Sequence, residues 1–203
     1  MNCWGRIAQA AAVLMAAASL AAQSPRPLAE SGETTVNGRS VPYVIRHLPT
    51  GSFPNLPLVI ADQLVVRGCL IPQTYQAHQP ENVVHASLER PGSSDWAVLC
   101  SVEGTVSLLV FFESAQEKPV VLASASEKDR LQPGTMTGGT GLYGFNWGID
   151  PASPRRIHEA QSGLAHRPPT PDHDALADSV IDRRTVYHFF SSGKWTLLEM
   201  PAD

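Results

Sequence analysis

The chain has 203 residues and a formal net charge of −4, from 15 Lys and Arg against 19 Asp and Glu. The charges are mixed in sign and no basic block occurs, which argues against nucleic acid or an anionic membrane surface as a partner. Seventeen Pro and 15 Gly are high for a helical bundle and favour short strands joined by turns.

Residues 1–22 have the pattern of a secretory signal peptide. Arg6 makes the start positive, residues 7–20 are mostly apolar, and small residues lead to an expected cleavage after Ala21 or Ala22. A membrane anchor is the alternative, but the apolar run is shorter than the roughly 20 residues that a spanning helix needs. We therefore expect export to the periplasm or the extracellular space, with no membrane span left after cleavage.

The rest of the chain predicts a short leader and one domain. Residues 23–33 (QSPRPLAESGE) are polar and contain prolines, so we expect them to be disordered. Residues 34–203 suit a single domain with its own core. Asn37-Gly38, between β-forming residues, predicts a tight hairpin. Pro42 cannot donate a backbone hydrogen bond, which places the second strand of that hairpin at a sheet edge.

The segment PNLPLVIADQLVVRGC (residues 54–69) predicts the main helix. Asn55 is a suitable cap, Pro57 is tolerated in the first turn, and Gly68 can end the helix in the left-handed conformation. One face is apolar at helical spacing and carries Leu56, Ile60 and Leu64. We expect this helix to pack on a sheet.

Cys69 and Cys100 are the two cysteines that remain after the signal peptide. Two cysteines exported to an oxidising compartment usually pair, so we predict a disulfide. The alternatives are two separate buried thiols or a catalytic thiol. In the chain-entropy model a loop of this length stabilises the fold by roughly 3.5–4 kcal/mol.

Residues 82–90, 95–102 and 105–112 predict a three-stranded meander with turns at Pro91-Gly92 and Glu103-Gly104. The second turn sets two faces, one with Trp96, Val98, Cys100, Ser107, Leu109 and Phe111, the other with Ala97, Leu99, Val106, Leu108 and Val110. Both faces are apolar, so this hairpin is expected at the centre of the sheet. Asp95 stands at the strand entrance, where it can accept hydrogen bonds from the turn.

The next segment, residues 119–134, predicts a strand and then a short helix with Ser124 and Glu127 as a capping box. Residues 134–148 are rich in glycine and predict a loop with one strand. In it Tyr143, Phe145 and Trp147 alternate, and they would form an exposed aromatic patch that binds a ligand.

The C-terminal third predicts a strand at residues 155–161, an extended Pro-rich connector at 166–172 and a short helix at 172–181. A closing hairpin follows, with Ser192-Gly193 in its turn. That turn places His188 on an apolar face, so we interpret it as a buried, hydrogen-bonded histidine. His85 lies in a predicted strand and receives the same interpretation.

Two segments resemble ligand-binding motifs. Gly139-x-Gly141-x-x-Gly144 has the spelling of a dinucleotide fingerprint but lacks the preceding strand and the following helix, so we expect no cofactor. The second is an acidic segment that contains Asp172, His173, Asp174 and Asp178. Its carboxylate oxygens and its imidazole are suitable ligands for a divalent cation. The spacing of these residues matches no EF-hand or zinc motif. We therefore favour the interpretation that the segment is the start of a helix followed by solvent-exposed acids.

The stretch GSSDWAVLCSVEGTVSLLVFF (residues 92–112) resembles one FG-GAP/VCBS-type propeller repeat without its Asp-rich calcium loop. One unit cannot build a propeller, so the resemblance implies no calcium site. The segments RGCLIPQ, DWAVLCS and VYHFFSSGKW resemble parts of a family of uncharacterised exported bacterial proteins. That resemblance implies a compact secreted domain and carries no activity or site residues.

Together these patterns predict an α+β fold with a mostly antiparallel β-sheet of meander and hairpins, one main packed helix and short helices. The favoured function is a non-enzymatic binding or interaction domain for a protein or small molecule. The alternative is a hydrolase or metal-dependent enzyme that uses the Asp172–Asp182 segment. The sequence alone does not decide whether the protein is an enzyme.

Overall fold

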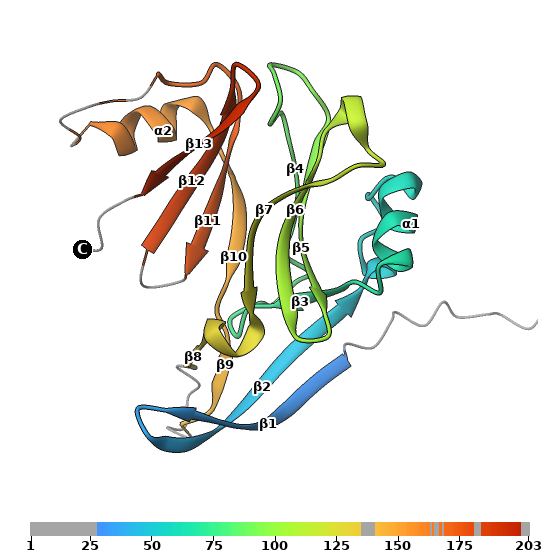
Figure 1. Cartoon of the computed structure of the whole chain (residues 1–203), viewed down its shortest axis with the longest axis vertical. Coiled ribbons are helices and arrows are strands. Elements are labelled where there is room, and N and C mark those ends of the chain that lie inside the picture. The colour runs from blue at the N-terminus through green and yellow to red at the C-terminus, as the bar shows by residue number, and fades with distance from the viewer. Residues whose placement is uncertain are drawn as a thin grey trace, which may run out of the picture.

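The computed structural model describes residues 28–134, 141–162, 164, 167, 169–180 and 184–199. The signal peptide predicted at residues 1–22 lies outside these ranges. The described chain is mostly β-structure with two α-helices, which agrees with the α+β assignment at this coarse level (Figure 1). None of its helices has the length and apolarity to cross a membrane.

The larger sheet has the strand order β7-β6-β5-β3-β2-β9-β8 in the described part of the chain, with β1 paired to β2 and β4 paired to β5. Its pairs are antiparallel except for β2–β9. Its strands are β1 (Leu28–Val36), β2 (Arg39–Pro49), β3 (Leu70–Gln73), β4 (Val83–Ala86), β5 (Asp95–Val102), β6 (Thr105–Phe111), β7 (Val120–Ser126), β8 (Leu131–Pro133) and β9 (Tyr143–Phe145).

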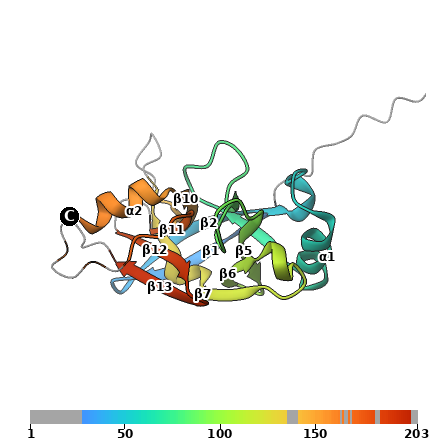
Figure 2. The same ribbon diagram turned by 90° about the horizontal axis from the view of Figure 1, so that it is seen from above.

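The smaller sheet is antiparallel and runs β10-β11-β12-β13 in the described residues. Its strands are β10 (Gly148–Ala152), β11 (Ala175–Val180), β12 (Arg184–Ser191) and β13 (Lys194–Glu199). The helices are α1 (Leu58–Val66) and α2 (Pro154–Gln161), with short 3-10 turns η1 (Thr50–Ser52), η2 (Glu113–Ala115) and η3 (Glu127–Arg130). The two α-helices lie on opposite sides of the molecule (Figures 1 and 2).

Three tight hairpin turns confirm the local predictions. Asn37-Gly38, Glu103-Gly104 and Ser192-Gly193 all have positive φ at both residues. This is the backbone that a two-residue hairpin turn matched to the strand twist requires. The register of the last hairpin places His188 opposite Leu197, as predicted.

Two predictions near the amino terminus are wrong. Residues 28–33, expected to belong to the disordered leader, form most of β1 and pair with β2. Strand β2 is not at an edge, because β1 lies on one side of it and β3 and β9 on the other. Hydrogen-bonded and non-hydrogen-bonded pairs alternate along this hairpin from the turn, and Glu33 and Pro42 form a non-hydrogen-bonded pair. The pairing of β1 with β2 therefore requires no backbone N–H from Pro42. Pairing with β9 begins only at Tyr43.

Two assignments in the C-terminal third are also wrong. Residues 155–161, expected as a strand, belong to α2, whose cap is Ser153 and whose first residue is Pro154. The expected helix at 172–181 is instead the strand β11 over residues 175–180. Its first half is buried between β10 and β12, and tertiary pairing therefore outweighs the local preference for a helix.

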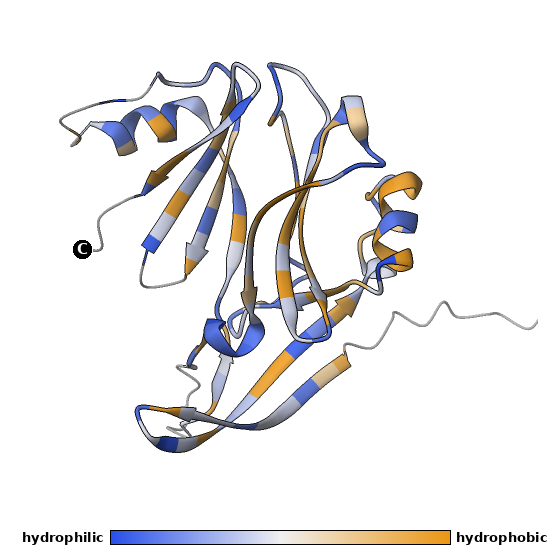
Figure 3. Ribbon diagram, viewed as in Figure 1, coloured by the Kyte–Doolittle hydropathy of each residue, from blue (hydrophilic) through white to orange (hydrophobic). Residues whose placement is uncertain are grey.

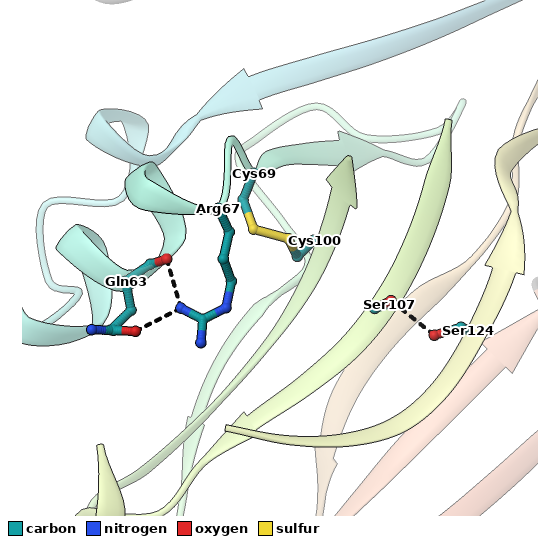
Figure 4. The surroundings of a disulfide bond; sticks show 6 residues. All are labelled: Gln63, Arg67, Cys69, Cys100, Ser107 and Ser124. Carbon is teal, nitrogen blue, oxygen red and sulfur yellow. Dashed lines mark hydrogen bonds between the residues drawn. A yellow bond between two sulfur atoms is a disulfide. The ribbon is translucent and has the colours of Figure 1, made fainter. Parts of the chain in front are cut away.

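The predicted capping box is wrong as well. The side chain that caps η3 is Ser126, which accepts a hydrogen bond from the Lys128 N–H. Ser124 instead lies 2.8 Å from the Ser107 hydroxyl across β6 and β7 (Figure 4).

The β5–β6 hairpin lies between two parts of the core, as its two apolar faces predict. One face packs against α1, whose Ile60 and Leu64 are fully buried. The other face packs toward the smaller sheet, with Phe145 and Trp147. A third cluster lies beneath α2. Figure 3 shows apolar segments along the facing strands, and apolar residues also on the outer side of α1, where Leu58 and Val66 are exposed.

Candidate ligand-binding cleft

A cavity of about 630 Å³ opens between the start of α1 and the β4–β5 pair. We call it the aromatic cleft and define it by its lining residues, Ser52, Phe53, Pro54, Asn55, Leu56, Pro80, Val83, His85 and Trp96. Two parts of the chain build it: the loop before α1, and the later segment that includes Pro80 and the strands β4 and β5. Its volume is in the range typical of small-molecule sites.

The floor of the cleft is a stacked pair of rings. His85 and Trp96 are directly opposite each other in the β4–β5 register, which brings their side chains onto the same face. Their ring centroids are 4.5 Å apart and the planes differ by 19°. Trp96 is buried on the α1 side of the sheet, whereas His85 is exposed. A ligand in the cleft would therefore meet the His85 ring.

Besides the His85 imidazole, the cleft has few polar groups. The Ser52 hydroxyl is buried and has no hydrogen-bond partner within the described part of the chain. An orphan hydroxyl costs free energy on burial, so a ligand that bonds to it recovers part of that cost. Asn55 contributes an exposed amide at the rim. None of the lining residues, all of them described, is Asp, Glu, Lys or Arg.

His85 also contacts a possible nucleophile. Its Nε2 lies 2.8 Å from the Ser94 hydroxyl. A serine–histidine pair acts as nucleophile and base when a third group orients the histidine. No carboxylate contacts His85 within the described residues, and stacking on Trp96 holds its ring instead. The pair therefore fixes the ring's orientation without completing a catalytic triad.

Asp95 holds the connection between β4 and β5 beside the cleft. Its fully buried carboxylate accepts hydrogen bonds from the backbone N–H groups of Leu88, Glu89 and Glu113 and from the Ser93 hydroxyl. This confirms the turn-bonding role predicted for Asp95. Four donors satisfy the charge in the interior, so the carboxylate is a structural anchor.

The disulfide between Cys69 and Cys100 confirms the predicted pairing (Figure 4). Their Cα atoms are 5.1 Å apart. It links Cys69, three residues after the end of α1, to the second half of β5, on the same face as Trp96. Gly68, with φ of 72°, gives the helix end the left-handed residue that it requires. The disulfide thus fastens the helix that follows one wall of the cleft to the strand that forms its floor.

The predicted aromatic patch of Tyr143, Phe145 and Trp147 is not an exposed surface. Phe145 and Trp147 are fully buried, and Tyr143 is half-buried. The Trp147 indole N–H donates to Asp178 at 2.6 Å, and the Arg130 guanidinium lies 4.2 Å from the centre of the ring. These two rings support the core, and only Tyr143 is left to contact a ligand.

The residues considered for a metal site make separate contacts. His173 Nδ1 lies 2.9 Å from exposed Asp172, while Asp174 accepts a hydrogen bond from the Ser87 N–H. Asp178 lies 3.1 Å from His188 and also bonds to Trp147. No group of three or more potential metal ligands occurs among the described residues. The structure therefore does not bring the proposed set together.

His188 is buried and bonded to Asp178, as predicted, but His85 is exposed, so the same interpretation is wrong for His85.

A second buried pair joins His47 Nε2 to Glu127 Oε1 at 2.6 Å. Burial acts to raise the pKa of Glu127, but hydrogen bonds from His47 and Ser101 and the His47 charge outweigh it, and the net pKa is lowered. The charged form of Glu127 is thus stabilised in the folded state.

Sequence reasoning missed Ser52, Phe53 and His85 as cleft residues. The aromatic and proline content of residues 52–57 was a signal, but nothing local indicated which strand lies opposite. No protein family, curated protein or solved structure matches the chain.

Proposed function

We propose that the protein is an exported, non-enzymatic binding domain that holds an uncharged ligand in the aromatic cleft. The observation that carries the proposal is a formed cavity with a ring floor and the unpartnered Ser52 hydroxyl. Apolar walls with a small number of placed polar groups are the usual composition of a ligand site. The lining contains no Asp, Glu, Lys or Arg, which favours a neutral ligand, because a buried charge would find no carboxylate, ammonium or guanidinium partner there.

The Cys69–Cys100 disulfide supports export, since disulfides persist in oxidising compartments. The signal-peptide pattern of residues 1–22 is the sequence argument for the same location. Mass spectrometry of the secreted protein tests this part of the proposal. We expect an amino terminus at Ala22 or Gln23; an intact Met1 on the exported protein would contradict cleavage.

The binding proposal is tested by nitrogen-15 NMR with two neutral ring probes, N-acetylprolinamide and methyl glucoside. The indole N–H signal of Trp96, assigned with Trp96→Phe, is expected to shift with at least one probe. Trp147, buried in a different part of the core, is the internal control. Loss of the bond to Ser52 in Ser52→Ala is expected to weaken binding about fivefold, the effect of a neutral hydrogen bond.

The matched control is Ser124→Ala, which removes the hydroxyl of an exposed serine on β7, away from the cleft. Equal weakening by both serine variants would show that the effect is not local. No shift of Trp96 with either probe, or a larger shift of Trp147, would contradict a ligand site at this position.

A further inference from the structure

A second cavity lies on the outer face of β2, which the single strand β3 separates from β5 of the aromatic cleft. Its volume is about 330 Å³. We call it the Arg46 cleft; its walls include Val44, Arg46, Tyr75, His78, Leu142 and Tyr143. On β2 the residues Tyr43, Ile45 and His47 face the core and are buried, so Val44 and Arg46 project to the opposite face.

The Arg46 guanidinium is held in place without a carboxylate partner. Its Nη2 donates to the carbonyl oxygens of Thr74 at 3.0 Å and Ala77 at 2.7 Å. Glu81, the acid of the same loop, is bonded to the Thr74 N–H and makes no ion pair with Arg46. Among the described residues no acid pairs with this guanidinium.

The walls around this guanidinium are apolar and aromatic. Tyr75 is fixed against β9, because its N–H donates to the Phe145 carbonyl at 2.9 Å and its Cβ packs over Gly144. A Cβ at residue 144 would lie 2.5 Å from the Cβ of Tyr75, so only glycine allows this approach. Gly144 of the apparent dinucleotide motif therefore shapes a cavity wall, and the chain continues into β10 and not into a helix.

We infer that the Arg46 cleft binds a small organic anion with a flat apolar body. The anionic group pairs with the free edge of the Arg46 guanidinium, and the ring of the ligand lies against Tyr75 and Tyr143. A guanidinium whose position is set by two carbonyls loses little freedom on binding, and its bond to a carboxylate is charge-assisted. This site is independent of the proposed function, because its ligand differs in charge and no lining residue is shared.

The test compares benzoate with benzamide, which has the same ring and a neutral head group, by calorimetry and NMR. We expect benzoate to bind about tenfold more tightly, the usual effect of a charge-assisted bond. Arg46→Gln, which keeps donors for the two carbonyls, is expected to remove this preference. Arg67→Gln is the matched control, since it removes the same charge from an exposed arginine bonded only to Gln63.

A second measurement uses the wild-type protein alone and does not depend on a variant's fold. Benzoate is expected to slow the modification of Arg46 by phenylglyoxal, mapped by mass spectrometry, and to leave Arg67 unaffected. Equal affinity for benzoate and benzamide, equal losses in both arginine variants, or benzoate shifts at Trp96 would each overturn the inference. The first two outcomes leave the test of the aromatic cleft untouched, whereas benzoate shifts at Trp96 would also contradict a preference of that cleft for uncharged ligands.

Discussion

Removal of the Cys69–Cys100 disulfide gives the sharpest quantitative test of how this fold is stabilised. The bond closes a loop with a sequence separation of 31 residues, which includes β3 and β4. In the chain-entropy model, that length corresponds to about 12 cal/mol/K, or about 3.7 kcal/mol at 25 °C. Domains of this size have total stabilities of about 5–15 kcal/mol, so the loss is a large fraction of the total.

The variant is Cys69→Ala with Cys100→Ala, and the assay is urea unfolding followed by tryptophan fluorescence. We expect the free energy of unfolding to fall by about 3.7 kcal/mol. The melting temperature is expected to fall by about 10 °C, from the usual 2–4 °C per kcal/mol at this chain length. Both sulfurs are buried, so the alanine variant also loses some packing in the cluster beneath α1.

Wild-type protein in reductant is the control, because it opens the loop and keeps both side chains. The reduced wild type is expected to show most of the stability loss seen in the alanine variant. The remaining difference between the two samples then measures the lost packing of the sulfur atoms. A change below about 1 kcal/mol in both samples would refute the entropic reasoning, since it would mean that the unfolded chain gains little freedom from opening the loop. Thiol labelling of the untreated protein is expected to detect no free cysteine at positions 69 and 100.

Two further predictions concern Glu127 and Gly144. Glu127 has a folded-state pKa below its ordinary 4.5, so it contributes stability above that pH, and this stability is lost as pH falls through the folded pKa. Glu127→Gln should lower the free energy of unfolding by about 1–3 kcal/mol at neutral pH. Between about pH 6 and about pH 3, the free energy of unfolding of this variant should change less with pH than that of the wild type. Urea titrations at several pH values measure it, and an equal pH dependence in both proteins would contradict the prediction. Gly144→Ala should lower the free energy of unfolding by about 1–3 kcal/mol, because the new Cβ clashes with Tyr75. Gly51→Ala, which has open space around its Cβ, should lower it by less. Equal losses in urea titrations would show that the close approach of Tyr75 does not require glycine at position 144.

Local signals were reliable wherever the backbone conformation of one or two residues decides the structure. Asn37-Gly38 and Ser192-Gly193 require positive φ, and a two-residue turn then sets the register of both strands. The alternation of apolar residues around Glu103-Gly104 similarly placed Trp96 and Cys100 on one face. The disulfide followed from the cysteine count and the expected compartment.

The β4–β5 connection shows where such reasoning ends. The predicted turn is present, with Gly92 at φ of 78° and the Ser93 N–H bonded to the Arg90 carbonyl. A regular hairpin through this turn would place Ser87 opposite Trp96. The observed partner is His85, two residues earlier, because the connecting segment bends to donate two N–H groups to the buried Asp95 carboxylate. The ring floor of the aromatic cleft therefore depends on one buried acid.

The sequence by itself determined the tight turns, the two faces of the central hairpin, the main helix and the pairing of the cysteines, because each depends on neighbouring residues or on composition. Only the tertiary structure decided that residues 154–161 are helical, that 175–180 pair as a strand, and that no acid of the described residues pairs with Arg46. Both clefts belong to this second group. Their walls come from segments far apart in the chain, and their proximity results from sheet pairing and core packing, which no local pattern records.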